Sequence, residues 1–115
     1  MIPKQIEEFL RSRNSNQWLS IGPLEIYVRQ SVRQNPNKHG LIRTFDIANV
    51  SCGHKGCGIF SNIFETLEDL SSYGFGAIYI EQVISDRFAE YFRRKNCKEV
   101  KSMGDIPSFF YFLNN

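Results

Sequence analysis

The residues best suited to chemistry lie together in the segment 52–58, which reads Cys-Gly-His-Lys-Gly-Cys-Gly. An extended run, residues 41–51, precedes it, and an amphipathic run follows it directly. A glycine-rich turn between a strand and a helix presents backbone N–H groups at the helix N-terminus, where these donors and the helix dipole favour an anion. Gly56 and Gly58 would let a phosphate approach the backbone, and Lys55 adds a positive charge. The segment therefore indicates a site for a phosphate-bearing cofactor or substrate.

The same segment holds side chains that suggest two other chemistries. Cys52, His54 and Cys57, together with the distant Cys97, could supply four ligands to zinc. They lack a Cys-x-x-Cys pair, however, and a free cysteine is usually a small buried apolar residue. Cys57 could also act as a nucleophile beside His54, because a helix N-terminus lowers a thiol pKa, but no third residue is evident to orient the histidine. We therefore expect no metal site, and we expect His39, which lies in a polar turn, to be solvated.

Length and composition limit the kind of protein that positions this segment. The chain has 115 residues, of which 42% are apolar and 23% charged, a balance typical of a single folded domain. A net charge of +2 does not indicate a nucleic-acid-binding surface. No apolar run approaches the ~18 residues that cross a bilayer, and the N-terminus lacks the apolar stretch of a secretory signal. Three cysteines favour a reducing cytoplasm over a disulfide framework.

The first half of the chain predicts one helix and three strands. Apolar residues recur at helical spacing over residues 2–13, and Pro3 suits the first turn of a helix. Residues 18–21 predict a short strand. Residues 24–33 alternate between apolar and polar side chains, as in a half-buried strand. Because residues 41–51 return as a β-rich run after a polar turn, we expect these last two strands to form an antiparallel hairpin.

The segment after the glycine-rich turn predicts a helix followed by a buried strand. Residues 59–73 carry one apolar face at helical spacing, and Gly74 is placed to end the helix. Residues 75–83 are rich in β-formers and apolar on both faces, which is typical of a central strand.

A second helix and two strands are predicted after this strand. Ser85 or Asp86 can cap the helix, which runs to about Lys95, and Asn96 tolerates a left-handed helix end. Residues 97–103 and 108–113 predict the two final strands. The aromatic residues of the last strand lack interleaved basic residues, so we expect them to pack into the core and not to stack nucleic-acid bases.

From about residue 41 to residue 113, this order of elements resembles the GNAT-type N-acetyltransferase superfamily. Family members carry a pyrophosphate-binding signature of Arg or Gln, two residues, Gly, one residue, and Gly or Ala. The signature follows a bulged strand and begins a long helix. The corresponding run here is residues 53–58, in which Gly56 and Gly58 match and Gly53 occupies the leading position.

A second motif of the family lies at the end of its later helix. That helix typically ends in an aromatic pair, followed after a few residues by Gly-Phe at the start of the next strand. Here Tyr91 and Phe92 form the aromatic pair, and Asn96 and Cys97 replace Gly-Phe.

The resemblance implies a fold and a cofactor. The fold is a single GNAT-like acyltransferase domain over residues 1–115, of the α/β (α+β) class. It has a mixed, mostly antiparallel central sheet with splayed central strands, flanking helices and an abbreviated N-terminal half. Members bind acetyl-CoA in a V-shaped opening, here between residues 41–51 and 75–83. The resemblance implies that backbone groups near Ala48, Asn49 and Val50 pair with the pantetheine arm. The residues whose amides would hold the pyrophosphate are His54, Lys55, Gly56, Cys57, Gly58 and Ile59.

The implied reaction is the transfer of an acetyl group to an amine of a small molecule or a protein, by direct attack of the amine on the thioester. In many members a tyrosine of the later helix protonates the leaving thiolate. Strict alignment puts Phe92 at that position, and Tyr91, one residue away, is the candidate acid. Asp46 and Glu81 are the candidate bases, although each could instead be a solvated carboxylate on a strand face.

The chain also departs from the family in ways that favour an alternative. Most members have a strand and two helices before the central hairpin, and those helices help to form the acceptor site. The shorter N-terminal half and Gly53 favour a catalytically degenerate protein of the same fold, acting as a CoA-binding, protein-interaction or inhibitory module. The acceptor site could also be completed by a second subunit, so a homodimer remains an open expectation.

Overall fold

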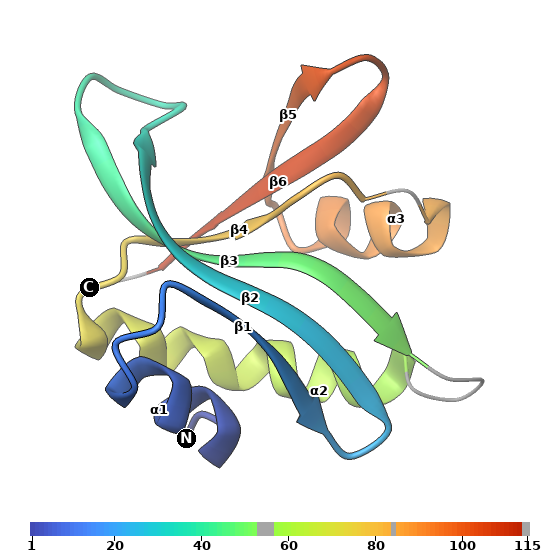
Figure 1. Ribbon diagram of the computed structural model, residues 1–115. Helices are drawn as coiled ribbons and strands as arrows, with labels where there is room; N and C mark the ends of the chain where they lie inside the picture. The colour runs from blue at the N-terminus through green and yellow to red at the C-terminus, as the bar shows by residue number, and fades with distance from the viewer. Residues whose placement is uncertain (53–56, 84, 114–115) are drawn as a thin grey trace.

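Six strands form one sheet in the computed structural model of the protein, which describes residues 1–52, 57–83 and 85–113 and, of residues 51, 52, 57, 102 and 103, the backbone alone. The strands are β1 (Asn16–Ile21), β2 (Leu24–Gln34), β3 (Leu41–Cys52), β4 (Ala77–Ile80), β5 (Lys98–Met103) and β6 (Ile106–Phe112). Their order across the sheet is β1-β2-β3-β4-β6-β5 (Figure 1). Neighbouring strands are antiparallel, except that β3 and β4 are parallel. A mixed, mostly antiparallel sheet of the α+β class is thus confirmed.

The helices lie close to their predicted positions. They are α1 (Lys4–Arg11), α2 (Cys57–Thr66), the 3₁₀ helix η1 (Leu67–Tyr73) and α3 (Asp86–Arg94). The helix predicted over residues 59–73 is therefore an α-helix that tightens into a 3₁₀ helix, and it ends at Gly74, whose φ of 90° lies in the left-handed region. Ser85 caps α3 by accepting a hydrogen bond from the N–H of Phe88. Asn96 follows the C-cap residue of α3 and adopts the left-handed conformation, with φ of 60°.

The helices and one face of the sheet enclose the main core. Helix residues such as Phe9, Phe64 and Phe92 pack there with inward-facing strand residues such as Phe45 and Phe109, all of them buried. Two of these contacts are edge-on ring pairs, Phe9 with Phe45 at 6.3 Å and Phe64 with Phe92 at 5.5 Å between centroids. The prediction that the last strand packs into the core is confirmed by Phe109.

The opposite face of the sheet carries a smaller apolar cluster to which no helix residue contributes among the described residues. Its buried members are Ala77, Tyr79 and Phe110. In Figure 1 the β2–β3 hairpin and the β5–β6 hairpin both rise on the side away from α1 and α2, one at each end of this face. We refer to it as the helix-free face.

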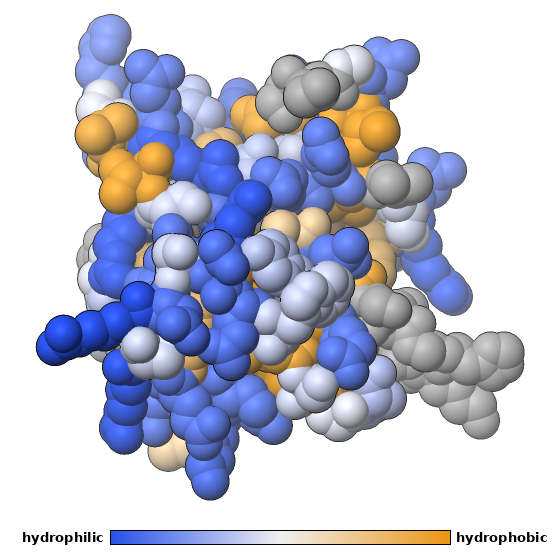
Figure 2. All heavy atoms as spheres, in the orientation of Figure 1, coloured by the Kyte–Doolittle hydropathy of each residue, from blue (hydrophilic) through white to orange (hydrophobic). Residues whose placement is uncertain are grey.

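The face shown in Figure 2 is mostly hydrophilic, with apolar side chains gathered in a few places. One of these places is the arm of the β2–β3 hairpin, where Val32 and Leu41 are 63% and 72% exposed. No helix in the described part of the chain combines the length and the apolar character that crossing a bilayer requires.

Candidate functional site: a cleft between diverging strands

The two parallel strands at the centre of the sheet separate after four residue pairs. The β3–β4 ladder ends at the pair Ile47–Ile80, and the last bond between the two segments runs from the N–H of Glu81 to the carbonyl of Ile47, at 3.0 Å. The chain after β4 then bonds to β6 instead. The N–H of Gln82 donates to the hydroxyl of Ser108 at 2.8 Å, and the N–H of Val83 donates to the Pro107 carbonyl. The segment after β4 therefore leaves β3.

Two local features account for this divergence. In β3, Ala48 is an extra residue opposite the Tyr27–Val28 step of β2, which makes a β-bulge that bends the strand. In the other segment, Gln82 has a φ of 47°, a left-handed conformation that costs a non-glycine residue about 1 kcal/mol. Strain of this kind persists where the surrounding structure imposes it, and it is frequent at binding sites. Ala48 and Gln82 thus open the sheet at its centre.

The opening is a cavity of about 450 Å³, within the range of small-molecule sites. Its walls are residues 47–50 of β3 and residues 80–83 of the diverging segment. Its remaining walls come from α2 and from the start and middle of α3: Phe60, Ser85, Phe88 and Phe92. Ala48, Asn49 and Val50, which the sequence predicts to contact a cofactor, therefore line it together. Beyond Ile47, the edge of β3 that faces away from β2 has no strand partner in the described part of the chain.

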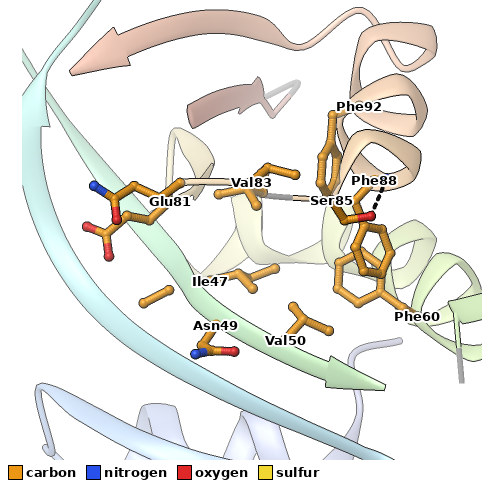
Figure 3. Close-up of a pocket in the computed structure, with 12 residues that line it drawn as sticks. Ile47, Asn49, Val50, Phe60, Glu81, Val83, Ser85, Phe88 and Phe92 are labelled. Atoms are coloured by element: carbon orange, nitrogen blue, oxygen red, sulfur yellow. Dashed lines mark hydrogen bonds between the residues drawn. The ribbon is translucent and has the colours of Figure 1, made fainter. Parts of the chain in front are cut away.

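The two ends of the cavity differ in chemistry (Figure 3). At one end Phe60, Phe88 and Phe92 form an aromatic group, with Phe60 5.2 Å from Phe88 and 6.1 Å from Phe92 between ring centroids. At the other end lies Glu81, whose side chain extends away from these rings. A ligand in this cavity would therefore meet apolar walls along most of its length and a carboxylate at one end.

Glu81 is the predicted base that the structure brings to the cavity. Its side chain is 31% exposed, and one carboxylate oxygen, Oε1, accepts a hydrogen bond from Arg29 Nη2 at 2.8 Å. Burial alone would lower the pKa of Arg29, but the hydrogen bond and charge of Glu81 outweigh it, so the net pKa of Arg29 is raised. The second oxygen of Glu81, Oε2, makes no hydrogen bond to the described residues.

Asp46, the other predicted base, is engaged in a network of its own. Its side chain is fully buried, and it accepts hydrogen bonds from the hydroxyls of Ser31 at 2.6 Å and Thr44 at 2.7 Å. Arg33 Nη2 donates to it at 2.6 Å, and Arg29 Nε lies 3.5 Å from it. Both oxygens therefore already have donors, and Asp46 is not among the described residues that line the cavity. Its geometry suits a carboxylate that orients two arginines.

Tyr91, the predicted acid, lies on another side of α3. Its ring packs against the ring of Phe64, with 6.1 Å between the two centroids. Its hydroxyl is buried without a hydrogen-bond partner in the described part of the chain. Burial raises the pKa of Tyr91. It is Phe92, one position further, that lines the cavity, because one residue turns the helix by about 100°. The structure thus brings Phe92, and not Tyr91, to the cleft.

The predicted phosphate-binding turn is only partly described. His54, Lys55 and Gly56 lie outside the described residues. The chain resumes in helical conformation at Cys57, whose backbone begins α2, and Gly58 and Ile59 are exposed in its first turn. A Cβ built on Gly58 would meet no atom within 4 Å, so the space next to its backbone is open. Phe60, the next residue along the helix, already lines the cavity, so the start of α2 lies at its border.

The alternative zinc site falls mostly on residues that the structure does not describe. His54 lies outside the described residues, as do the side chains of Cys52 and Cys57. Cys97 is half-buried, and burial raises its thiol pKa to about 12, so it remains protonated at neutral pH. The described residues contain no group of three or more potential metal ligands.

Some residues of the site carry no signal in the sequence. Gln82 is distinguished only by its left-handed φ, and Arg29 only by its contact with Glu81, 52 positions away along the chain. The aromatic group could have been found in part, since Phe88 and Phe92 are spaced one helical turn apart. Their contact with Phe60 of α2 could not have been predicted, because it depends on how the two helices pack.

Comparisons with protein families and with curated proteins identify no relative of this chain. No protein-family model matches the chain, and no curated protein matches it. The geometry of the cleft is therefore the basis for a proposed function.

Proposed function

We propose that this protein is an acetyl-CoA-dependent N-acetyltransferase that uses the cleft between β3 and the segment after β4. The single observation that carries the proposal is the divergence of two parallel central strands into a lined cavity, with the helix α2 bordering that cavity. This combination is what the resemblance to the GNAT superfamily leads one to expect. The proposed localisation is cytoplasmic.

The cleft is suited to an extended ligand with its own amide groups. The edge of β3 beyond Ile47 offers backbone groups without a strand partner among the described residues, so a pantetheine arm could pair with Ala48, Asn49 and Val50 as an added strand. The start of α2 borders the same cavity, and a helix N-terminus is a favourable place for phosphate. Gly58 leaves its backbone open to such an approach. The aromatic group would exclude water from the ligand.

The chain's own part in the reaction would be positioning and proton removal. Acetyl-CoA supplies the electrophilic thioester carbonyl. In the overall reaction the amine nitrogen gains an acyl group and the carbon–sulfur bond breaks. An ammonium acceptor loses two protons, the departing thiolate gains one, and so one proton is released in total. Glu81 Oε2 is the acceptor for a proton of the amine, directly or through one water. With Tyr91 away from the cleft, we propose that solvent protonates the thiolate.

The test is release of free thiol from acetyl-CoA in the presence of a panel of amines and short peptides. Asn49 is exposed and lines the cavity, so Asn49→Trp should fill it without emptying the core. We expect this change to lower kcat/KM by at least about tenfold, since a ligand would have to displace the indole ring.

Asn16→Trp is the matched control, because Asn16 is also exposed on a strand but lies in β1, outside the cavity lining. Thiol release that is unaffected by Asn49→Trp would contradict the proposed site. No release above the protein-free rate with any amine would contradict the enzymatic proposal. Binding of CoA without transfer would then favour the non-catalytic alternative.

A further inference from the structure

A chain of ion pairs runs across the helix-free face to the end of the cleft. The buried carboxylate of Asp46 contacts Arg33 at 2.6 Å and Arg29 at 3.5 Å, both through the same oxygen, Oδ2. Arg29 in turn reaches Glu81, at the polar end of the cavity, at 2.8 Å. The carboxylate of Asp46 therefore holds the two guanidinium groups next to each other.

Each arginine has a terminal nitrogen without a partner among the described residues. The nitrogen Nη1 of Arg29 and that of Arg33 make no hydrogen bond to the described residues. The two side chains are 29% and 28% exposed. Arg33 is further fixed by its position 3.9 Å above the centre of the Tyr79 ring. Two partly exposed guanidinium groups are thus held in place on the helix-free face, so a ligand would not have to order these side chains.

The charge of this group selects the kind of ligand. Two arginines against Asp46 and Glu81 give a formal charge of zero, so the group does not attract polyanions in general. It does match a zwitterion, whose single negative charge can meet the two Nη1 donors while its ammonium group meets Glu81 Oε2. A phosphate dianion would leave excess negative charge beside two carboxylates. A carboxylate is therefore the better match.

We propose that Arg29 and Arg33 form a carboxylate subsite on the helix-free face, and that the acceptor amine is an amino acid or a close relative that carries both groups. The amine assignment rests on the proposed acetyltransferase function. Asp46 is a positioning residue in this account, since it holds both arginines and has no free oxygen for the ligand.

The test uses glycine, the smallest amino acid, against methylamine, which lacks the carboxylate. The arginine Nε–Hε resonances of the ¹⁵N-labelled protein are followed during each titration, without cofactor. We expect glycine to shift the Arg29 and Arg33 signals in a saturable way and methylamine to leave them in place. No saturable shift with glycine, or equal shifts with methylamine, would overturn the subsite.

Variants give a second readout. Arg33→Gln should weaken glycine binding about tenfold through loss of a charge-assisted hydrogen bond. If the glutamine variant unfolds, Arg33→Lys replaces it in the test, because lysine keeps a positive charge near Asp46. It lacks the planar guanidinium group that can donate two parallel hydrogen bonds, so it should also weaken glycine binding. Arg93→Gln is the matched control: Arg93 also pairs with a carboxylate, Glu99, and lies over a ring, Phe109. Equal losses in the Arg33 and Arg93 variants would contradict the assignment.

The subsite and the proposed function can fail separately. A protein that binds CoA but not glycine would overturn the subsite alone. A protein that binds glycine but not CoA would overturn the acceptor assignment together with the acetyltransferase proposal.

Discussion

Two carboxylates on the helix-free face, Asp46 and Glu81, differ in what surrounds them. Asp46 is buried among hydroxyl and guanidinium donors, whereas Glu81 keeps a free oxygen at the end of the cavity. A carboxylate whose oxygens are already hydrogen-bonded is poorly placed to take a proton from a ligand. We therefore assign the base to Glu81 and the support of the arginines to Asp46.

Asp46→Asn should destabilise the protein strongly. The change removes the carboxylate that pairs with Arg33 at 2.6 Å and that lies 3.5 Å from Arg29, and breaking a buried ion pair on one side costs about 3–5 kcal/mol. Urea denaturation measures the change in the free energy of unfolding. Asp105→Asn, at an exposed position in the β5–β6 turn, is the control and should change it by less than about 0.5 kcal/mol. Equal effects of the two changes would refute the role given to Asp46.

Glu81→Gln should instead impair turnover. The amide cannot take up the amine's proton, and loss of a general base lowers kcat by about 10²-fold or more. Since the Arg29–Glu81 pair is partly exposed, stability should fall by no more than about 1 kcal/mol. Kinetics with acetyl-CoA and an accepted amine, beside CoA titrations, separates the two effects. Glu25→Gln, an exposed carboxylate of β2, is the control. A kcat that stays at the wild-type value would remove Glu81 from the mechanism.

At the scale of elements, local signals predict most of the secondary structure. The caps at Ser85, Gly74 and Asn96 lie where the sequence indicates, because each follows from the preference of one residue for one backbone conformation. The strand predicted over residues 75–83 is the exception, since β4 ends at Ile80. After β4, Glu81 still bonds to Ile47 of β3, but Gln82 and Val83 bond to Ser108 and Pro107 of β6. That choice of partner depends on tertiary contacts, which apolar character alone does not encode.

The cleft, too, could be predicted only in part from the sequence. The resemblance leads one to expect Ala48, Asn49 and Val50 at a cofactor site, and these residues do line the cavity. The orientation of Tyr91 and Phe92 could not be decided from their adjacent positions, because it depends on how α3 rotates against its neighbours. The ion pair of Arg29 with Glu81 could not be predicted either, since it joins residues 52 positions apart in the chain.

Gly58→Ala tests the start of α2. In the free protein the new methyl group would meet nothing within 4 Å, and alanine favours a helix over glycine by up to about 1 kcal/mol. We therefore expect the Tm to stay the same or rise. If a phosphate approaches this backbone, the same methyl group should weaken CoA binding about tenfold. Ser61→Ala, one turn further along α2, is the control for a general effect on the helix. Unchanged CoA affinity in Gly58→Ala would mean that the phosphates lie elsewhere.

At the scale of the whole molecule, the two faces of the sheet differ in what covers them. The helices cover one face and build the main core, while the other face is free of helices among the described residues. The cleft at the centre of the sheet is bordered by both. Under the proposed function, a cofactor would bind beside α2 and α3 while an acceptor approaches from the helix-free face.

Global stability should fall as the pH rises above about 9. Burial raises the pKa of Cys97 from 9.0 to about 12. The hydrogen bond to Glu68, with burial, raises the pKa of Tyr111 from 10.0 to about 12. The unfolded chain then loses these protons first and binds fewer of them than the folded state, so the free energy of unfolding declines between about pH 9 and pH 12.

Urea denaturation from about pH 8 to about pH 11 measures this decline. Cys97→Ala removes one of the two titrating groups and should make the decline shallower. A free energy of unfolding that rises over this interval would show that neither group keeps its proton on folding.

Calorimetric titration with CoA and acetyl-CoA tests the central claim most directly, because the cleft is assigned to this cofactor before any acceptor is known. We predict saturable binding of one CoA per chain, weakened by Asn49→Trp and unaffected by Asn16→Trp. No heat of binding at millimolar cofactor would contradict the account, as would binding that is equally strong in both variants.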